Sequence, residues 1–126
     1  METQREQIRE QQRQLWNNVS SGWKKWDQFI MQFMRPIGDA IIERLEIKED
    51  DIVLDIAAGT GEPGLTIAAI ATKGQVIGTD LSNEMLQIAE ANAVAKNIAK
   101  ATFFEVIFLV ILIALFFRNL FNFCFL

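Results

Sequence analysis

The sequence contains no histidine and one cysteine, Cys124, among its 126 residues. Without histidine the chain lacks the usual general base and the usual metal ligand, which excludes Ser-His and Cys-His catalytic pairs. A single cysteine excludes a disulfide framework and a Cys-rich zinc site. We therefore expect no metal site, and the sequence leaves the catalytic residues unknown.

The chain also lacks an excess of basic residues. Its net charge is −4 and its isoelectric point is near 4.8, so we expect no nucleic-acid partner. The first dozen residues are charged and Gln-rich, without the apolar region of a signal peptide, so we expect a cytoplasmic protein. Apolar residues make up 51% and charged residues 22%, which is typical of a globular domain or part of one.

Residues 1–46 are predicted to form a helical lead-in. Ser20–Gly22 predict a helix break between tryptophans, and Pro36 predicts the start of a second helix because it cannot donate an internal hydrogen bond. An apolar stripe with helical spacing follows the tryptophans. We expect it to pack against a sheet, to close a pocket or to line a substrate entrance; its members are Phe29, Phe33, Ile37, Ile41 and Leu45.

Residues 47–105 predict an α/β unit in the order β-α-β-α-β with parallel strands. The expected strands are 52–56, 75–79 and a third beginning at Ala101. One helix is expected from about residue 65 to residue 71. A second helix, capped at its start by Ser82, is expected to run to about Ala99. The second of these helices should present Met85, Ile88, Ala89, Val94 and Ala95.

The first strand leads into a glycine-rich loop, which indicates a ligand site. Gly59 and Gly61 can adopt backbone conformations that other residues avoid and leave room for a ligand. Asp80 ends the second strand, at the carboxyl edge where open α/β sheets bind ligands, and could accept both hydroxyls of a ribose.

Two ligand classes fit this loop. Gly59, Gly61 and Gly64 spell the G-x-G-x-x-G pattern of dinucleotide-dependent oxidoreductases, although this pattern alone is weak. Asp55, four residues before Gly59, favours a ligand carrying an ammonium and a sulfonium instead, because a pyrophosphate gains nothing from a buried negative charge.

Two longer stretches resemble a family. Residues 53–61, Val-Leu-Asp-Ile-Ala-Ala-Gly-Thr-Gly, resemble the first motif of class I S-adenosylmethionine-dependent methyltransferases. Residues 76–86, Val-Ile-Gly-Thr-Asp-Leu-Ser-Asn-Glu-Met-Leu, resemble the second-strand motif of the same family. The stretch Trp-Lys-Lys-Trp-Asp at 23–27 is similar to the lead-in of the ubiquinone/menaquinone C-methyltransferase-like branch.

The resemblance implies a Rossmann-like methyltransferase fold with S-adenosylmethionine as cofactor and a small molecule, for example a quinone precursor, as methyl acceptor. Asp55 would act on the methionyl part of the cofactor, and Asp80 would bind its ribose. Leu81 and Met85 would pack near the adenine, and the loop residues touching the cofactor would be Ala57, Ala58, Gly59 and Gly61. Ala57 replaces a glycine that is common in the family.

The resemblance stops after Glu105, which predicts only the N-terminal half of the family's seven-stranded sheet. Residues 106–126 begin with twelve consecutive apolar residues, Val106–Phe117. Three interpretations remain open for this tail: an out-of-frame or truncated end read from an A/T-rich gene, a membrane anchor, or a buried core segment. The anchor would make the chain a nonenzymatic membrane-tethered fragment, and the oligomeric state is not predicted.

Overall fold

The computed structural model describes residues 3–106 and 123–125, and these residues form a helix followed by a parallel α/β unit. The sheet contains β1 (Ile52–Ile56), β2 (Gln75–Asp80), β3 (Ala101–Glu105) and β4 (Phe123–Phe125) in the order β3-β2-β1-β4. Every neighbouring pair is parallel, and the register sets Asp55 beside Gly78 and Asp80 beside Glu105. The three strands expected from the sequence are thus confirmed. The fourth, in the apolar tail, was not foreseen.

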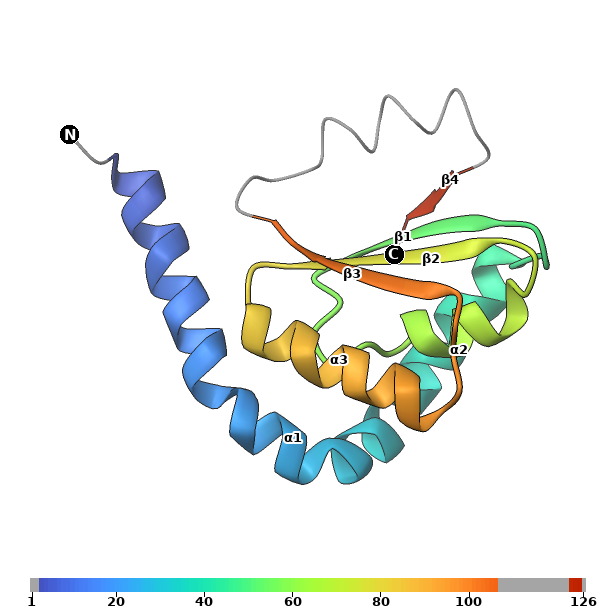
Figure 1. Ribbon diagram of the computed structural model, residues 1–126, viewed down its shortest axis with the longest axis horizontal. Helices are drawn as coiled ribbons and strands as arrows, with labels where there is room; N and C mark the ends of the chain where they lie inside the picture. Colours follow the sequence, from blue (N-terminus) through green and yellow to red (C-terminus); the bar gives the residue numbers. More distant parts are fainter. Residues whose placement is uncertain (1–2, 107–122, 126) are drawn as a thin grey trace.

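Helices α2 (Gly64–Ile70) and α3 (Asn83–Ala95) cover the same face of the sheet (Figure 1). They bury a small apolar core in which Val53, Ile67 and Val76 are completely inaccessible to solvent. Burying side chains of this size is the main favourable contribution to folding. The fold is therefore the N-terminal half of a Rossmann-like α/β domain, as the sequence predicts.

Helix α3 is shorter than expected. The Ser82 side chain caps its start by accepting a hydrogen bond from the Met85 amide, as predicted, but the helix ends at Ala95 rather than near Ala99. Asn97 adopts a left-handed conformation that turns the chain toward β3. Met85, Ile88 and Ala89 are buried as expected. Val94 and Ala95 are exposed, because they lie on the face of the last turn that points away from the sheet.

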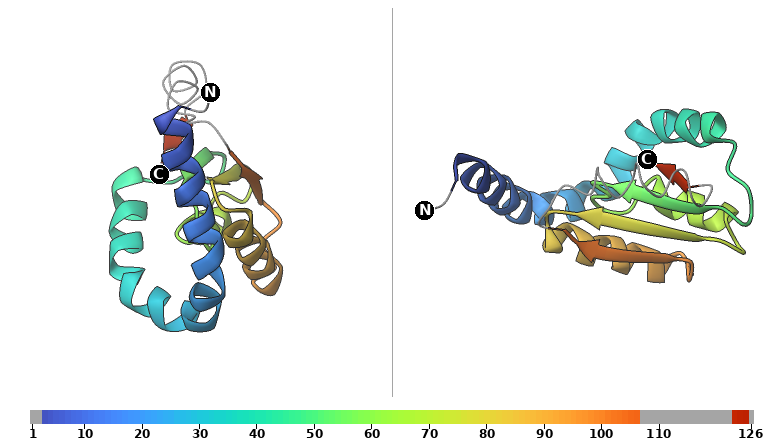
Figure 2. Two further views of the ribbon diagram at one scale, coloured as in Figure 1. Left: turned by 90° about the vertical axis from the view of Figure 1, so that its left-hand side faces the viewer. Right: turned by 90° about the horizontal axis from the view of Figure 1, so that it is seen from above.

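Helix α1 (Gln4–Leu45) is continuous, so the predicted break at Ser20–Gly22 and the predicted second helix at Pro36 are both wrong. The Ser20 hydroxyl donates to the carbonyl of Asn17 within the same helix, which lets serine stay in the helical interior. Figure 2 shows that α1 is strongly curved, and an internal proline is a known cause of such bending.

The apolar stripe of α1 does not pack against the sheet along its length, but Ile37 and Ile41 line a cavity, which agrees with the alternative that the stripe closes a pocket. Phe33 is 78% exposed, and Phe29 and Ile37 are also exposed, whereas Ile41 and Leu45 are partly buried. Of the α1 residues, all of which are described, only Ser20 is buried.

The interpretations of the apolar tail fall mostly on residues 107–122, which lie outside the described residues. Within residues 3–106 and 123–125, no helix has the length and apolarity needed to cross a membrane.

Candidate functional site

The glycine loop and the end of β2 meet at the carboxyl edge of the sheet. Both oxygens of the Asp80 carboxylate accept backbone hydrogen bonds, Oδ2 from the Gly59 amide and Oδ1 from the Ser82 amide, each at 2.9 Å. One side chain therefore joins the loop after β1 to the loop after β2. Each oxygen keeps a further lone pair with which it can accept a hydroxyl.

The backbone of the loop follows the conformations that its glycines allow. Gly59 and Gly61 have φ values of 54° and 107°, and Ala57 also lies in the left-handed region at 62°. A Cβ atom built on Gly59 would meet nothing within 4 Å, so the space beside this residue is open. The Ala58 amide donates to the Thr79 carbonyl at 2.9 Å, which fixes the loop to β2.

Asp55 is a buried carboxylate beside this loop. It is 4% exposed, and its Oδ2 atom has no hydrogen-bond partner among the described residues. Its pKa is raised to about 7, first by burial and then by the neighbouring carboxylate of Asp80, with a smaller contribution from Glu62, while a hydrogen bond from the Gly64 amide opposes the rise. A buried carboxylate with one oxygen lacking a partner, at a ligand edge, is a typical mark of a site that receives a cationic or hydrogen-bond-donating group.

The third glycine of the G-x-G-x-x-G pattern has a packing role. A Cβ atom on Gly64 would lie 2.6 Å from Asp55 Oδ2, so any side chain there would displace the carboxylate. Gly64 therefore makes room for Asp55.

The structure brings together Asp55, Asp80 and the loop from Ala57 to Gly61. Leu81 follows Asp80 and is half-buried, whereas Met85 is 3% exposed within the core face of α3. Their contacts with an adenine stay a prediction, as do the roles of the other residues.

Sequence reasoning missed several polar residues that surround this edge. Asn92 Nδ2 donates to the Thr60 carbonyl at 3.0 Å and to Asp27 Oδ2 at 3.4 Å. The Ser82 hydroxyl donates to Asn17 Oδ1 at 2.6 Å. No local motif marks these contacts, because the partners are 32 or 65 residues apart in the sequence.

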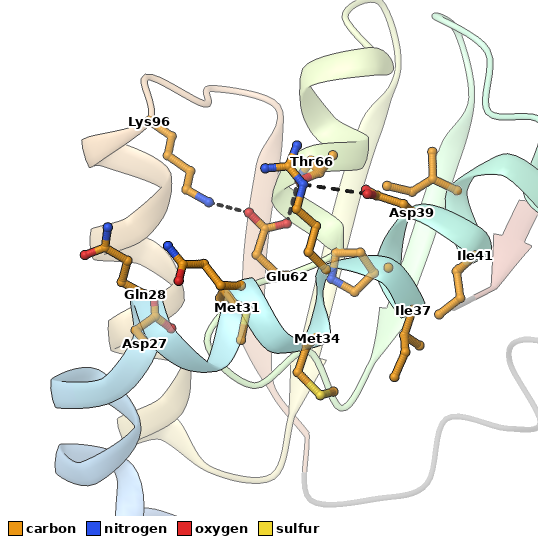
Figure 3. A pocket seen from close by; sticks show the side chains of 15 residues that line it. Asp27, Gln28, Met31, Met34, Ile37, Asp39, Ile41, Glu62, Thr66 and Lys96 are labelled. Carbon is orange, nitrogen blue, oxygen red and sulfur yellow. Dashed lines mark hydrogen bonds and ion pairs between the residues drawn. The ribbon is translucent and has the colours of Figure 1, made fainter.

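A cavity of about 470 Å³ lies between α1, the start of α2 and the end of α3 (Figure 3). Its apolar wall comes mainly from methionine and isoleucine side chains of α1. Opposite them, Glu62 forms an ion pair with Lys96 and accepts a 2.7 Å hydrogen bond from the Thr66 hydroxyl (Figure 3). The cavity therefore borders Glu62 and Pro63, which directly follow the glycine loop in the sequence.

Residues 53–110 match the family model described as a methyltransferase domain. This part of the chain is therefore similar to methyltransferase domains. The match continues five residues past Glu105, where the resemblance was expected to stop. The oxidoreductase alternative receives no support from these relationships.

Individual relatives show the same similarity. A 23S rRNA (uracil(1939)-C(5))-methyltransferase of Acinetobacter baumannii is 40% identical over 64 residues, covering 50% of this chain and 14% of the relative. A demethylmenaquinone methyltransferase of Lactobacillus johnsonii is 32% identical over 59 residues, covering 46% and 24%. The chain thus spans less than a quarter of the length of these curated relatives.

The fold is shared with a solved RNA methyltransferase from Salinibacter ruber in complex with S-adenosyl-L-homocysteine. The TM-score is 0.53 at 21% identity, and the superposed region covers 56% of this chain and 46% of that one. At this identity the likeness concerns the fold, and it agrees with the half-domain seen here.

Proposed function

We propose that the chain binds S-adenosylmethionine at the carboxyl edge of β1 and β2 and serves methyl transfer to a small molecule. The observation that carries the proposal is the Asp80 carboxylate, fixed by two backbone amides beside an open glycine loop. A carboxylate held in this way is oriented in advance to accept the two hydroxyls of a ribose.

The residues present fit this cofactor. Asp55 offers a buried carboxylate with an unpaired oxygen, and the cofactor carries an ammonium and a sulfonium that such a charge attracts. Gly59 leaves the backbone of the loop open to a ligand. When bound, S-adenosylmethionine supplies a methyl group on a positively charged sulfur, which is a ready leaving group.

The work left to the protein is mainly binding and orientation. Holding an acceptor in line with the activated methyl group can supply much of the rate enhancement. The Asp80 and Asp55 side chains and the loop amides would fix the cofactor for this purpose. This explains how a chain without histidine can still belong to a methyltransferase, and no catalytic base is proposed.

The acceptor is the less constrained part of the proposal. A small molecule is favoured because the site edge carries Asp55, Asp80 and Glu105 and the chain has a net charge of −4, which would repel a nucleic-acid backbone. The rRNA methyltransferase relative supports RNA as the competing acceptor. Transfer of radiolabelled methyl to a demethylated quinone, and not to an rRNA fragment, is expected; the reverse result would overturn the small-molecule acceptor.

Calorimetric titration with S-adenosylhomocysteine tests the cofactor site. Asp80→Ala should weaken binding by about 10-fold or more, because hydrogen bonds to a charged group are lost and the loop loses its tie. Asp50→Ala, in the exposed turn before β1, is the matched control and should bind like the wild type. Equal affinity of all three folded proteins would show that the ligand, if bound, does not use this edge.

A further inference from the structure

Helix α1 touches both cofactor-binding loops through single polar side chains. Asn17 accepts a 2.6 Å hydrogen bond from Ser82, whose own amide is bound to the Asp80 carboxylate. Farther along α1, Asp27 accepts from Asn92, and the same Asn92 amide donates to the carbonyl of Thr60, between the two loop glycines. One contact of α1 therefore leads to the loop after β2, through Ser82, and the other leads to the loop after β1, through Thr60. These are the two loops that the Asp80 carboxylate joins.

Apolar packing holds α1 mainly near its C-terminal end, where Ile42 packs against the core of the α/β unit, and contributes little along the rest of the helix. Ser20 is its one buried residue, and the aromatic side chains of Phe29 and Phe33 point into solvent. A cavity of about 470 Å³ separates the second half of α1 from α2 (Figure 3). A segment with few buried apolar contacts opens at low free-energy cost, so its position is sensitive to a few hydrogen bonds.

We propose that α1 is a strap that closes on the cofactor site, with Asn92 as the positioning residue that couples it to the glycine loop. This rests on the proposed function. Ligand binding would order the loop and with it the Thr60 carbonyl, which holds the Asn92 amide in place to meet Asp27. By linkage, an α1 docked through Asn92 and Asn17 would raise the affinity of the loops for the ligand.

The chain carries its own reporter for this motion. All three tryptophans, Trp16, Trp23 and Trp26, lie in α1, and the chain contains no tyrosine. Trp16 and Trp23 lie with their ring centroids 6.2 Å apart and their planes tilted by 56°, on either side of Asn17 and Ser20 along the helix. Tryptophan fluorescence therefore reports on α1, while the ligand is expected to bind elsewhere.

The test combines two variants with matched controls. Asn92→Asp keeps the size of the side chain but removes its N–H donors, so the contacts to Thr60 and Asp27 are lost. Asn97→Asp makes the same change at an exposed position after α3. Asn17→Ala removes the acceptor of the Ser82 hydroxyl, and Asn18→Ala, at the exposed neighbouring position, is its control.

Each protein is titrated with S-adenosylhomocysteine by calorimetry and by acrylamide quenching of tryptophan. In the wild type and both controls, quenching should fall about 2-fold or more on saturation. In Asn92→Asp we expect about 10-fold weaker binding, the size of one lost buried hydrogen bond. In this variant, acrylamide quenching of tryptophan should be high without ligand and should change little at saturation. If Asn92 only stabilised the fold, saturating ligand would still lower the quenching in the variant as it does in the wild type.

The outcomes separate the two proposals. If the wild type binds S-adenosylhomocysteine and Asn92→Asp matches Asn97→Asp in affinity and quenching, the strap is overturned and the cofactor site stands. If the folded wild type does not bind the probe, both proposals fall. A quenching change in the wild type that Asn92→Asp and Asn17→Ala abolish, while both controls keep it, supports the coupling.

Discussion

Helix α1 and the α/β unit formed by β1–β3, α2 and α3 bury their apolar residues to very different extents. In the α/β unit, Val53, Ile67 and Val76 are fully inaccessible and pack against one another across the sheet and α2. In α1, Phe29, Phe33 and Ile37 are more than half exposed, and the helix meets Ser82 and Asn92 of the α/β unit through hydrogen bonds.

This difference separates what makes an element form from what holds it in place. The spacing of apolar residues in α1 matches a helix, and the helix forms. The spacing does not determine whether another element packs against the apolar face of the helix. Among the described residues, no element covers Phe29 and Phe33. The stability of the described structure should therefore reside in the α/β unit, and α1 should tolerate changes that the unit does not.

The largest expected effect concerns Asp55, the buried acid of the α/β unit. Burial and then Asp80 raise its pKa to about 7, so between about pH 4 and pH 7 the folded protein holds a proton that the unfolded chain has lost. The free energy of unfolding should therefore fall as pH rises through this window, by ~4 kcal/mol at most. Asp55→Asn should remove most of this fall, which urea unfolding at pH 4.5 and pH 8 would measure.

The partly exposed acid Glu10 of α1 supplies the contrast. Hydrogen bonds from Arg13 and then Gln14 lower the pKa of Glu10 to about 2, so its contribution is lost only as pH falls below the ordinary range of a carboxylate. Glu10→Gln should leave the pH dependence between pH 4.5 and pH 8 unchanged. Equal slopes for the wild type and Asp55→Asn would contradict the assignment of this effect to Asp55.

The local elements of the α/β unit could be predicted because each has its own signal. Short β-rich runs gave the strands, and the Ser82 cap gave the start of α3. The pairing of Asp80 with the glycine loop also follows from the rule that parallel strands bring their carboxyl ends to one edge. These features depend on nearby residues or on one general rule of topology.

What could not be predicted depends on distant or competing contacts. Ser20 stays in α1, where its hydroxyl donates to the Asn17 carbonyl, and the helix continues through Pro36 to Leu45. The pairing of β4 with β1 and the contact of Asn92 with Thr60 join segments that share no motif. The exposed stripe of α1 is a further case, because periodicity does not identify a packing partner.

A smaller effect compares side-chain truncation in the two regions. Ile67 is fully buried in α2, so Ile67→Ala should lower the free energy of unfolding by about 3 kcal/mol through lost burial and the cavity left behind. Phe33 is 78% exposed in α1, so Phe33→Ala should change it by less than about 0.5 kcal/mol. Denaturant unfolding measures both, and a loss in Phe33→Ala as large as in Ile67→Ala would mean that the stripe is covered in solution.

The smallest expected effect tests the continuity of α1 at Gly22. A Cβ atom on Gly22 would meet nothing within 4 Å, so Gly22→Ala should stabilise the helix by about 0.5–1 kcal/mol, because glycine loses more backbone entropy than alanine. The far-UV circular dichroism of the helix during thermal melting measures this gain. The opposite sign is expected for Gly74→Ala in the α/β unit, where a Cβ atom would lie 1.9 Å from the Asp51 carbonyl oxygen. A loss of helix signal in Gly22→Ala would instead indicate that the helix is broken near Gly22. Alanine is better than glycine inside a helix, so it can destabilise this position only if the backbone there is not helical.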